Sequence, residues 1–484
     1  MSYVMAIDAG TTGVRAVLFG ARGESISIAY REFPVSFPRP GWAEQDPQRL
    51  WQATVEVIAE AVEGAGVEAR EVVALGIANQ RASIVAWEAR ELRPLGPLIT
   101  WQDGRTSERC LELQEQGFFV NPNVSVTKAE WIIKNVGAAA AAASSGRLCL
   151  GTLDSWLVAK LTGGAHVTDH ANASATGMYA HLTKSWDEQL LDAVAIPVAA
   201  LPEIVDSAGE FGRVTADVAV AGAEVAAICG DQQASLYGLG CTEAGRTKCS
   251  YGTAAMVDMN SGGEIAIGGA GTYPLVAWAR EGRATYCVEG TVVTAGAAVQ
   301  WLRDGLGLVE EAAETDSLAQ SVGDSGGVWA LPAFQGLGTP WVASDARALI
   351  GGLSRGSTGA HVARALLESI AHRVADVAEA VWQGGEHRPA SLRVDGGASR
   401  NDFLMQRQAD YLGMPVERSA ESDGAALGVA SLAAAAHRGE DAPQPPAWRA
   451  DRVFEPRISS DERQCERDGW RRRVEGLQRA GMLG

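Results

Sequence analysis

The chain has 484 residues, of which 46% are hydrophobic and 21% charged, and its formal net charge is −18. This length exceeds what one core usually spans, so we expect two domains, and the hydrophobic fraction excludes a disordered or collagen-like chain. The acidic balance, with no basic stripe, argues against nucleic acid as a partner. It does not exclude an anionic small molecule, because local groups decide that binding.

The cysteines and the N-terminus indicate where in the cell the protein is expected to be. Seven cysteines are dispersed without a C-x-x-C pair. This pattern predicts a reducing, cytoplasmic setting and neither a disulfide framework nor a zinc site. The N-terminus lacks a basic segment ahead of an apolar one, so we expect no signal peptide. No apolar run reaches the roughly 18–20 residues of a membrane span, so we expect no membrane association.

The first twenty residues predict a β-hairpin. Residues 4–7 and 14–19 are rich in β-formers, and Asp8-Ala9-Gly10-Thr11-Thr12-Gly13 lies between them. The backbone N–H groups and threonine hydroxyls of such a turn can hold a phosphate. A plain hairpin turn is the alternative.

Further along, strands are expected to end in polar side chains. Residues 45–75 favour a helix, and residues 72–78 form a buried strand followed by Asn79-Gln80-Arg81. Shorter strands are predicted over 83–87 and 98–103. Open α/β sheets bind ligands at the carboxyl ends of their strands, so these polar groups indicate a site.

A second half repeats this organisation. Residues 225–233 predict a strand that runs into a polar turn, and residues 247–259 predict two strands around Gly252-Thr253. Residues 392–401 predict a strand, a glycine turn and the start of a helix, which is an arrangement suited to phosphate. The repeat indicates a duplicated α/β domain with a nucleotide between its halves and a boundary near 240–248.

The end of the chain has a different composition. Residues 442–446 are proline-rich and predict a loop. The charged stretch 461–473 predicts a solvated terminal helix.

Familiar nucleotide signatures are missing: neither a P-loop, nor G-x-G-x-x-G, nor the protein-kinase motifs occur. The turn at 8–12 instead resembles the first phosphate loop of the FGGY carbohydrate kinases. Ser250-Tyr251-Gly252-Thr253 resembles their second phosphate loop, and Asp395-Gly396-Gly397-Ala398 resembles their adenosine motif. Similar blocks cover most of residues 3–435 and are most similar to the glycerol kinases within that family.

The resemblance implies an α/β fold of two duplicated ribonuclease H-like domains, as in the actin-like ATPases, with a cleft between them. The N-terminal domain would span 1–243 and carry the first phosphate loop, the acceptor pocket and the catalytic aspartate. The C-terminal domain would span 244–484 and carry the second phosphate loop, the adenosine motif and the terminal helix. The implied activity is ATP-dependent phosphorylation of a hydroxyl on a small polyol or sugar.

Two aspartates are the expected catalytic residues. In the resemblance Asp231 holds the position of the general base, which accepts the proton of the attacking hydroxyl. The alternative for Asp231 is a cap of the helix that follows. Asp8 is the expected partner of Mg²⁺, through water, since Mg²⁺ retains several waters and takes one or two carboxylates.

The resemblance also implies a set of nucleotide contacts. They are Thr11, Thr12, Arg15, Gly252, Thr253, Gly296, Gln300, Gly397 and Asn401. Three of these have plain alternatives: a solvated strand residue for Arg15, helix packing for Gly296 and a helix cap for Asn401.

The acceptor pocket matches less well. The implied substrate contacts are Arg81, Ala82, Trp101, Asn123, Asp231, Gln232 and Met256. Ala82, Asn123 and Met256 replace a glutamate, a tyrosine and a phenylalanine of the glycerol kinase pattern. A lost hydrogen-bonding group can change discrimination by orders of magnitude. We therefore hypothesise a polyol or ketose larger than glycerol, with glycerol kept as a candidate.

Other activities stay open at this stage. A ketose kinase such as a ribulokinase or xylulokinase is one alternative, although Arg81-Ala82 replaces the Met-His pair expected in a xylulokinase. A non-catalytic actin- or Hsp70-like nucleotide-binding sensor is another, since fold alone does not decide function. The polar acceptor set argues for an enzyme. The family resemblance implies a homodimer or homotetramer.

Overall fold

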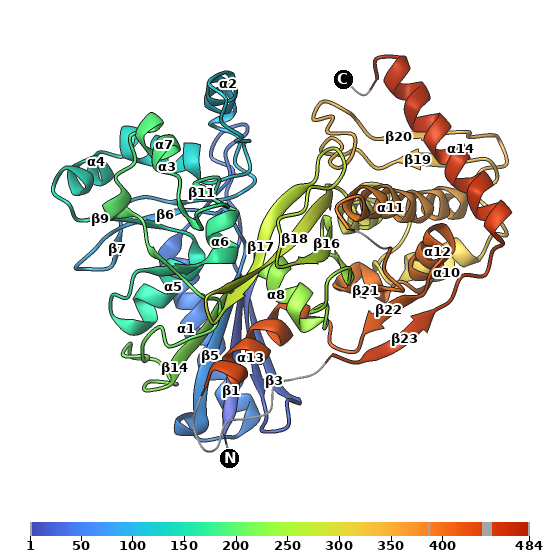
Figure 1. The fold of residues 1–484 in the computed structure, drawn as a ribbon. Helices are drawn as coiled ribbons and strands as arrows, with labels where there is room; N and C mark the ends of the chain where they lie inside the picture. The colour runs from blue at the N-terminus through green and yellow to red at the C-terminus, as the bar shows by residue number, and fades with distance from the viewer. Residues whose placement is uncertain (1, 386–387, 438–447, 483–484) are drawn as a thin grey trace. The chain divides into compact units, whose positions relative to one another are not determined.

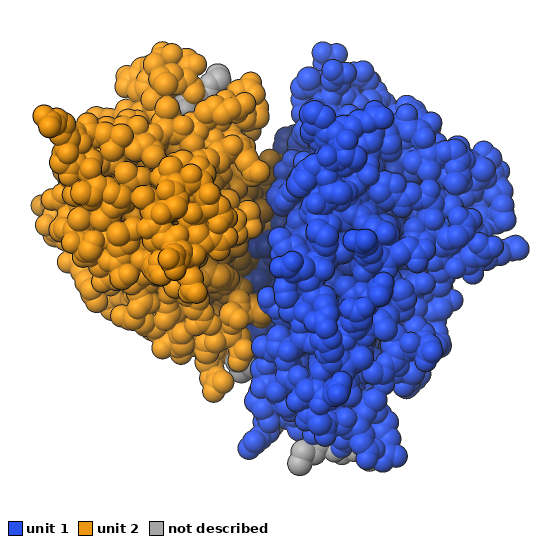
Figure 2. Space-filling view, turned by 180° about the vertical axis from the view of Figure 1, so that it is seen from behind, with its two compact units in different colours: residues 1–238, 276–285, 425–447 blue, residues 239–275, 286–424, 448–484 orange. Residues whose placement is uncertain are grey.

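The computed structural model describes residues 2–385, 388–437 and 448–482 (Figure 1). The chain forms two compact units (Figure 2): residues 1–238, 276–285 and 425–447 make the first, and residues 239–275, 286–424 and 448–484 make the second. Each unit contains a large sheet with helices packed on it, so the expected α/β class is confirmed. The domain limits 1–243 and 244–484 remain a prediction.

The strands of the first unit are β1 (Tyr3–Ala9), β2 (Gly13–Phe19), β3 (Ser25–Glu32), β4 (Glu44–Gln45), β5 (Val72–Asn79), β6 (Val85–Glu88), β7 (Arg93–Pro94), β8 (Leu98–Ile99), β9 (Leu148–Gly151), β10 (Val167–Asp169), β11 (Tyr179–Ala180), β12 (Ser185–Trp186), β13 (Glu203–Val205) and β14 (Glu224–Gly230). Its helices are α1 (Pro47–Ala65), α2 (Ser107–Glu115), α3 (Val126–Asn135), α4 (Gly137–Ser144), α5 (Leu153–Thr162), α6 (His170–Ser174), α7 (Glu188–Ala193), α8 (Asp231–Gly238) and α13 (Gly424–Ala436).

The main sheet of this unit has the order β14-β5-β1-β2-β3. β1 and β2 pair antiparallel, which confirms the predicted hairpin. β1, β5 and β14 run parallel, with Ala78 opposite both Asp8 and Cys229. Parallel strands end at the same edge of a sheet, so the residues that follow these three strands lie along one edge.

Helices cover both faces of this sheet. α1 starts at Pro47 after the N-cap Asp46, whose side chain accepts the N–H of Gln48, and ends at the left-handed Gly66. Its apolar stripe packs with Met5 and Ile7 of β1. The alternate residues of β1, Val4 and Ala6, point to the other face and pack against α13, which Figure 1 shows beside β1 and β5.

A smaller layer completes the unit. β6, β7 and β9 form a three-stranded sheet, and its residues Ala86 and Leu150 share a hydrophobic cluster with α2, α3, α4 and α7. This layer carries the two short segments around Trp101 and Asn123 that the sequence predicts to face an acceptor.

The second unit contains β15 (Thr247–Tyr251), β16 (Ala255–Gly262), β19 (Trp329–Leu331), β20 (Leu349–Gly351), β21 (Leu392–Asp395), β22 (Val416–Ser419) and β23 (Ala450–Phe454), with most of β18 (Arg283–Val292) and the start of β17 (Tyr273–Arg280). Its helices are α9 (Gly296–Asp304), α10 (Glu314–Gln320), α11 (Gly359–Trp382), α12 (Asp402–Leu412) and α14 (Ser460–Arg479). The large sheet has the order β17-β18-β16-β15-β21-β22-β23, and α11 and α12 pack on it through one apolar cluster.

Some sequence predictions differ from the structure. The helix expected over 45–75 ends at Ala65, and the strand expected over 98–103 is only β8. The polar turn expected after residue 230 is the start of α8. The proline-rich residues 442–446 lie outside the described residues. Within the described ranges, the structure contains no helix long and apolar enough to cross a membrane.

The terminal helix corrects another prediction. α14 is a helix, but it is not wholly solvated, because Arg467, Trp470 and Val474 on one face are buried. Trp470 Nε1 donates to Asp376 Oδ2 over 2.8 Å, and Arg467 pairs with the same carboxylate. Burial of these groups is tolerated because each finds a polar partner.

Candidate active site

The edge at the carboxyl ends of β1, β5 and β14 brings three predicted residues together. Asp8 is the half-buried penultimate residue of β1, Arg81 follows β5, and Asp231 follows β14. Arg81 Nε lies 3.4 Å from Asp231 Oδ1, and the two side chains are 11% and 25% exposed. Gly230 permits this approach, because a Cβ there would lie 2.6 Å from Arg81 Cδ.

Asp231 is the first residue of α8. Its Oδ1 accepts the backbone N–H of Gln232, the next residue, over 2.8 Å, whereas an N-cap side chain accepts from a residue two or three positions further along. The carboxylate is nevertheless a quarter exposed, so a ligand can reach it. This contact orients the carboxylate and does not bury it, so it is compatible with a catalytic role of Asp231.

The predicted first phosphate loop is anchored by a hydrogen-bond network. Trp101 Nε1 donates to Thr11 Oγ1 over 3.1 Å, and Thr11 Oγ1 donates to Gln80 Oε1 over 3.3 Å. Gln45 Nε2 donates to the Thr11 carbonyl over 2.8 Å, and Gln45 Oε1 accepts from Gln80 Nε2 over 2.8 Å. The loop is therefore held by residues from three other segments.

Thr12 and Arg15 are the two other positions predicted to contact the nucleotide near this loop. Thr12 is exposed, and its carbonyl accepts from the Tyr30 hydroxyl over 3.4 Å. Arg15 is half-buried on β2, and its guanidinium lies 5.5 Å from the centre of the Tyr30 ring. Their predicted contact with a nucleotide remains a prediction.

The positions predicted to contact the acceptor are fixed through their backbone. Ala82 is buried and has a left-handed φ of 57°, and Ser125 Oγ donates to its carbonyl over 3.0 Å. The Trp101 N–H donates to Ser83 Oγ over 3.0 Å, and Ser83 Oγ in turn donates to Gln80 Oε1 over 3.0 Å. Sequence reasoning missed both serines, because nothing in their local pattern distinguishes them from turn residues.

Lys128 was missed as well. It lies on α3 and is fully buried, and its Nζ donates to the carbonyls of Trp101 over 3.0 Å and Asn123 over 3.4 Å. Burial lowers the pKa of Lys128 to about 7, although the charge of Asp103 opposes the shift. The side chain of Asn123 itself is exposed. The one signal in the sequence is that Lys128 falls on the apolar, buried face of α3, where a lysine is unusual.

In the second unit, two glycine turns lie at one sheet edge. β15 and β21 are parallel with Ser250 opposite Asp395, and Gly252-Thr253 and Gly396-Gly397 follow these strands. Gly396 has a φ of 86°, and a Cβ there would lie 2.6 Å from the Tyr251 carbonyl oxygen, so this close turn requires glycine.

Helix α9 begins against the second of the predicted phosphate loops. The Gly296 N–H donates to the Gly252 carbonyl over 3.0 Å, and a Cβ on Gly296 would lie 2.5 Å from that oxygen. Close packing of α9 against Gly252 therefore explains a glycine at position 296, as the helix-packing alternative expects. Gln300, one turn further along, is exposed.

Asn401 caps α12. Its side chain accepts the N–H of Leu404 over 2.9 Å and donates to Thr315 Oγ1 over 3.1 Å. The structure therefore contains the helix cap that was considered as an alternative for Asn401.

The space around Gly397 is open, because a Cβ there would meet no atom within 4 Å. A nucleotide contact at Gly397 or at Asn401 remains a prediction.

A buried ion pair lies beside the predicted second phosphate loop. Lys248 Nζ lies 2.8 Å from Asp258 Oδ2, both side chains are fully buried, and Nζ also donates to Ser250 Oγ over 2.9 Å. Burial opposes the charge of Lys248, but the carboxylates of Asp258 and Asp395 outweigh it and raise its pKa.

Met256 on β16 is half-buried, and its Sδ accepts from Thr291 Oγ1 over 3.2 Å.

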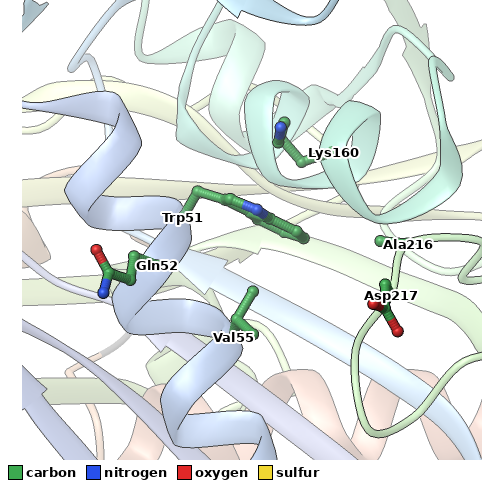
Figure 3. Close-up of a pocket in the computed structure, with 6 residues that line it drawn as sticks. All are labelled: Trp51, Gln52, Val55, Lys160, Ala216 and Asp217. Carbon is green, nitrogen blue, oxygen red and sulfur yellow. The ribbon is translucent and has the colours of Figure 1, made fainter.

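A separate cavity of about 450 Å³ opens in the first unit (Figure 3). Trp51, Gln52, Val55, Lys160, Ala216 and Asp217 line it. The Lys160 ammonium lies 5.2 Å from the centre of the Trp51 ring. None of the predicted site residues lines this cavity.

Known proteins match the chain over nearly its whole length. Residues 3–238 match the N-terminal domain of the FGGY family of carbohydrate kinases, and residues 247–437 match its C-terminal domain. A glycerol kinase of Dechloromonas aromatica is 42% identical over 486 residues, which cover 98% of this chain and 97% of that protein.

Solved structures agree. A glycerol kinase of Plasmodium falciparum with ADP is 26% identical with a TM-score of 0.89, covering 98% of each chain. A xylulose kinase of Rhodospirillum rubrum is 25% identical with a TM-score of 0.83, covering 98% of this chain and 99% of that one. The family match thus defines an ATP-dependent phosphotransferase with an alcohol group as acceptor, and the similar structures show that its fold is that of the actin-like ATPases. The chain belongs to the FGGY family of carbohydrate kinases.

Proposed function

We propose that the protein transfers the γ-phosphoryl group of ATP to a hydroxyl of a small polyol in the cytoplasm, with Asp231 as the general base. The observation that carries this proposal is the sheet edge where Asp231 pairs with Arg81 over 3.4 Å. A partly exposed carboxylate at the carboxyl end of a parallel strand can accept the proton of an attacking hydroxyl. The family match supplies the phosphoryl donor.

The reaction needs positioning and charge neutralisation more than covalent chemistry. Arg81 and Gln232, which flank Asp231, would orient the acceptor hydroxyl, and the Trp101 ring would pack on its carbon chain. The hydroxyls of Thr11, Thr12 and Thr253 would donate to phosphate oxygens. The other nucleotide contacts proposed are Arg15, Gly252, Gly296, Gln300, Gly397 and Asn401.

The residues present fit a magnesium ion. Asp8 provides carboxylate oxygens at the same sheet edge as Asp231, and Mg²⁺ prefers oxygen ligands and retains several waters. We propose that Asp8 holds the ion through water. When bound, Mg²⁺ neutralises the charge of the phosphate groups.

The acceptor we propose is a polyol longer than glycerol. Ala82 has only a methyl group in a buried position where the glycerol kinase pattern has a glutamate, and Asn123 and Met256 likewise replace an aromatic residue. Smaller or differently shaped side chains leave room for a four- or five-carbon chain. A ketose is the second candidate, supported by the xylulose kinase among the similar structures. We also propose a homodimer or homotetramer.

The first test is ADP release with ATP and Mg²⁺ against a panel of acceptors: glycerol, dihydroxyacetone, erythritol, ribitol, xylitol, D-ribulose, L-ribulose, D-xylulose and gluconate. We expect a higher kcat/KM with a four- or five-carbon polyol than with glycerol. A preference for glycerol would overturn the chain-length proposal, and a preference for a ketose would establish the second candidate. If no acceptor of this panel stimulates the release of ADP from ATP, the kinase proposal fails for this panel.

The assignment of Asp231 has its own test. Asp231→Asn should bind ADP as the unaltered protein does in calorimetry, yet transfer phosphoryl at least ~10²-fold more slowly, because the amide cannot accept the proton. Asp217→Asn, which alters an exposed aspartate of the same unit, is the matched control and should leave the rate unchanged. Full activity in Asp231→Asn would contradict the assignment.

A further inference from the structure

Lysine is scarce in this chain, and its distribution is uneven. Only five of the 41 basic residues are lysines: Lys128, Lys134, Lys160, Lys184 and Lys248. Lys128 and Lys248 are nevertheless fully buried, and each lies beside one of the two predicted sites. Burying a charge is costly, and an arginine cannot avoid the cost by losing its proton, whereas a lysine can. Lys248 keeps its charge beside Asp258, whereas Lys128 donates to two carbonyl groups, so of the two it is Lys128 whose position indicates a need for a neutral amine.

The contacts of Lys128 join two separate segments of the acceptor site. Nζ donates to the carbonyl of Trp101 over 3.0 Å and to the carbonyl of Asn123 over 3.4 Å. Trp101 is held further by Ser83 at its N–H and by Thr11 at its indole. The amine is thus the one group among these that ties the Asn123 segment to the Trp101 segment.

We propose that Lys128 is a positioning residue of the acceptor site and that its neutral amine, not its ammonium form, holds the Trp101 and Asn123 backbones in the geometry that binds the polyol. The inference rests on the proposed function, because it concerns the same acceptor. A neutral amine has two N–H bonds, one for each carbonyl, whereas an ammonium has a third that needs a further acceptor.

The charged groups around Lys128 do not provide a counter-ion of its own. Asp103 faces it, but both oxygens of this carboxylate accept from Arg105 over 2.7 and 2.9 Å, and one also accepts the Ala43 N–H over 2.6 Å. Arg105 adds like charge and Cys110 on α2 is the other titratable neighbour. Burial therefore lowers the pKa of Lys128 to about 7, and protonation below this pH adds a charge beside the pocket.

The experiment compares Lys128→Met with Lys134→Met between pH 6 and 9, with glycerol and ribitol as acceptors. Lys134 is the matched control, because it lies on the same helix, is 61% exposed and pairs with Glu130. Losing both hydrogen bonds in Lys128→Met should raise the acceptor KM by about 10-fold or more while the KM for ATP stays within about two-fold. The unaltered protein and Lys134→Met should show an acceptor KM that rises as the pH falls through about 7, and Lys128→Met should show no such step.

A second measurement does not depend on activity or on the variant folding. With lysine labelled at ¹³Cε, the five lysines of the unaltered protein give few resonances, and one should titrate near pH 7. Equal changes in both KM values, an acceptor KM without a pH step, or five lysines that all titrate near their usual pKa would overturn the inference. Absence of phosphoryl transfer to every acceptor would instead contradict the proposed function, and the titration would still decide whether the amine is neutral.

Discussion

At the scale of single residues, Ala82 is the unusual member of the proposed acceptor site. Its left-handed φ of 57° costs a residue with a Cβ about 1–2 kcal/mol. The Ser125 hydroxyl holds its carbonyl in this conformation over 3.0 Å. Strained residues of this kind concentrate at functional sites, where the surrounding structure imposes the conformation. The side chain at this position therefore has a fixed direction, which suits a residue that determines specificity.

We predict that Ala82→Glu shifts specificity towards glycerol. The new carboxylate would occupy space needed by a longer chain and provide a hydrogen-bond acceptor for a hydroxyl. The ratio of kcat/KM for glycerol to that for ribitol should rise by about 10-fold or more. Ala82→Gly removes only the methyl group and serves as the control, with a ratio close to that of the unaltered protein. An unchanged ratio in Ala82→Glu would remove Ala82 from the specificity determinants.

At the scale of elements, α14 docks on its unit through a polar cluster and not through an apolar stripe alone. The His372 ring of α11 stacks on Tyr411 at 3.9 Å and on Trp470 at 5.0 Å between ring centres. Arg467 donates to the His372 carbonyl over 3.0 Å and to Asp376 over 2.7 Å. Burial and then the positive charge of Arg467 lower the pKa of His372 well below 6.5.

This shift predicts a pH dependence of stability. Since the pKa of His372 is lower in the folded state, the unfolded state binds more protons below about pH 6.5, and the free energy of unfolding falls as the pH drops. The effect is absent well above that pH, where the histidine is neutral in both states. In His372→Phe, which keeps a stacking ring, the loss of unfolding free energy between pH 6.5 and 5.5 should be smaller by up to about 1 kcal/mol in urea unfolding, because an unfolded histidine is already half protonated at pH 6.5. His166, His170 and His181 also have lowered pKa values, but they contribute equally to both proteins. Identical pH profiles would show that His372 does not titrate on unfolding.

At the scale of the whole molecule, the chain returns to its first unit near its end. α13 buries Val429 and Leu432 against residues of β1, β5 and β14. The backbones approach so closely that glycine is required at two positions. A Cβ on Gly76 would lie 2.4 Å from the Val429 carbonyl oxygen, and a Cβ on Gly428 would lie 1.8 Å from the Ala234 carbonyl oxygen. One face of the first sheet therefore depends on residues far along the sequence.

The return of the chain predicts that residues 1–243 do not fold to a native state alone. Without α13, the fragment exposes the apolar face formed by Val4, Ala6 and Ala226. It should bind the dye ANS and lack a near-ultraviolet circular dichroism signal, as molten states do. The same fragment joined by a flexible linker to residues 424–437 should unfold cooperatively. Cooperative unfolding of the shorter fragment with the same midpoint would contradict this dependence.

Much of the fold followed from local patterns. The β1–β2 hairpin, β5, β14 and the start of α12 were predictable, because apolar runs, glycine turns and caps act over a few residues. The buried face of α14 was not, since Arg467 appears as one charge among many until Asp376 is placed beside it. Lys128 was missed for the same reason, because its partners are carbonyl groups, which every residue has.

The sequence by itself determined the family and located the glycine turns and the two aspartates that we propose to act, because these depend on residue types at short spacing. Only the tertiary structure decided that Arg81 meets Asp231 and that Asn401 caps α12. It also decided that an amine joins the Trp101 and Asn123 segments. Such contacts depend on distances between segments remote in sequence, and those distances are set by how strands and helices pack, which no local pattern encodes.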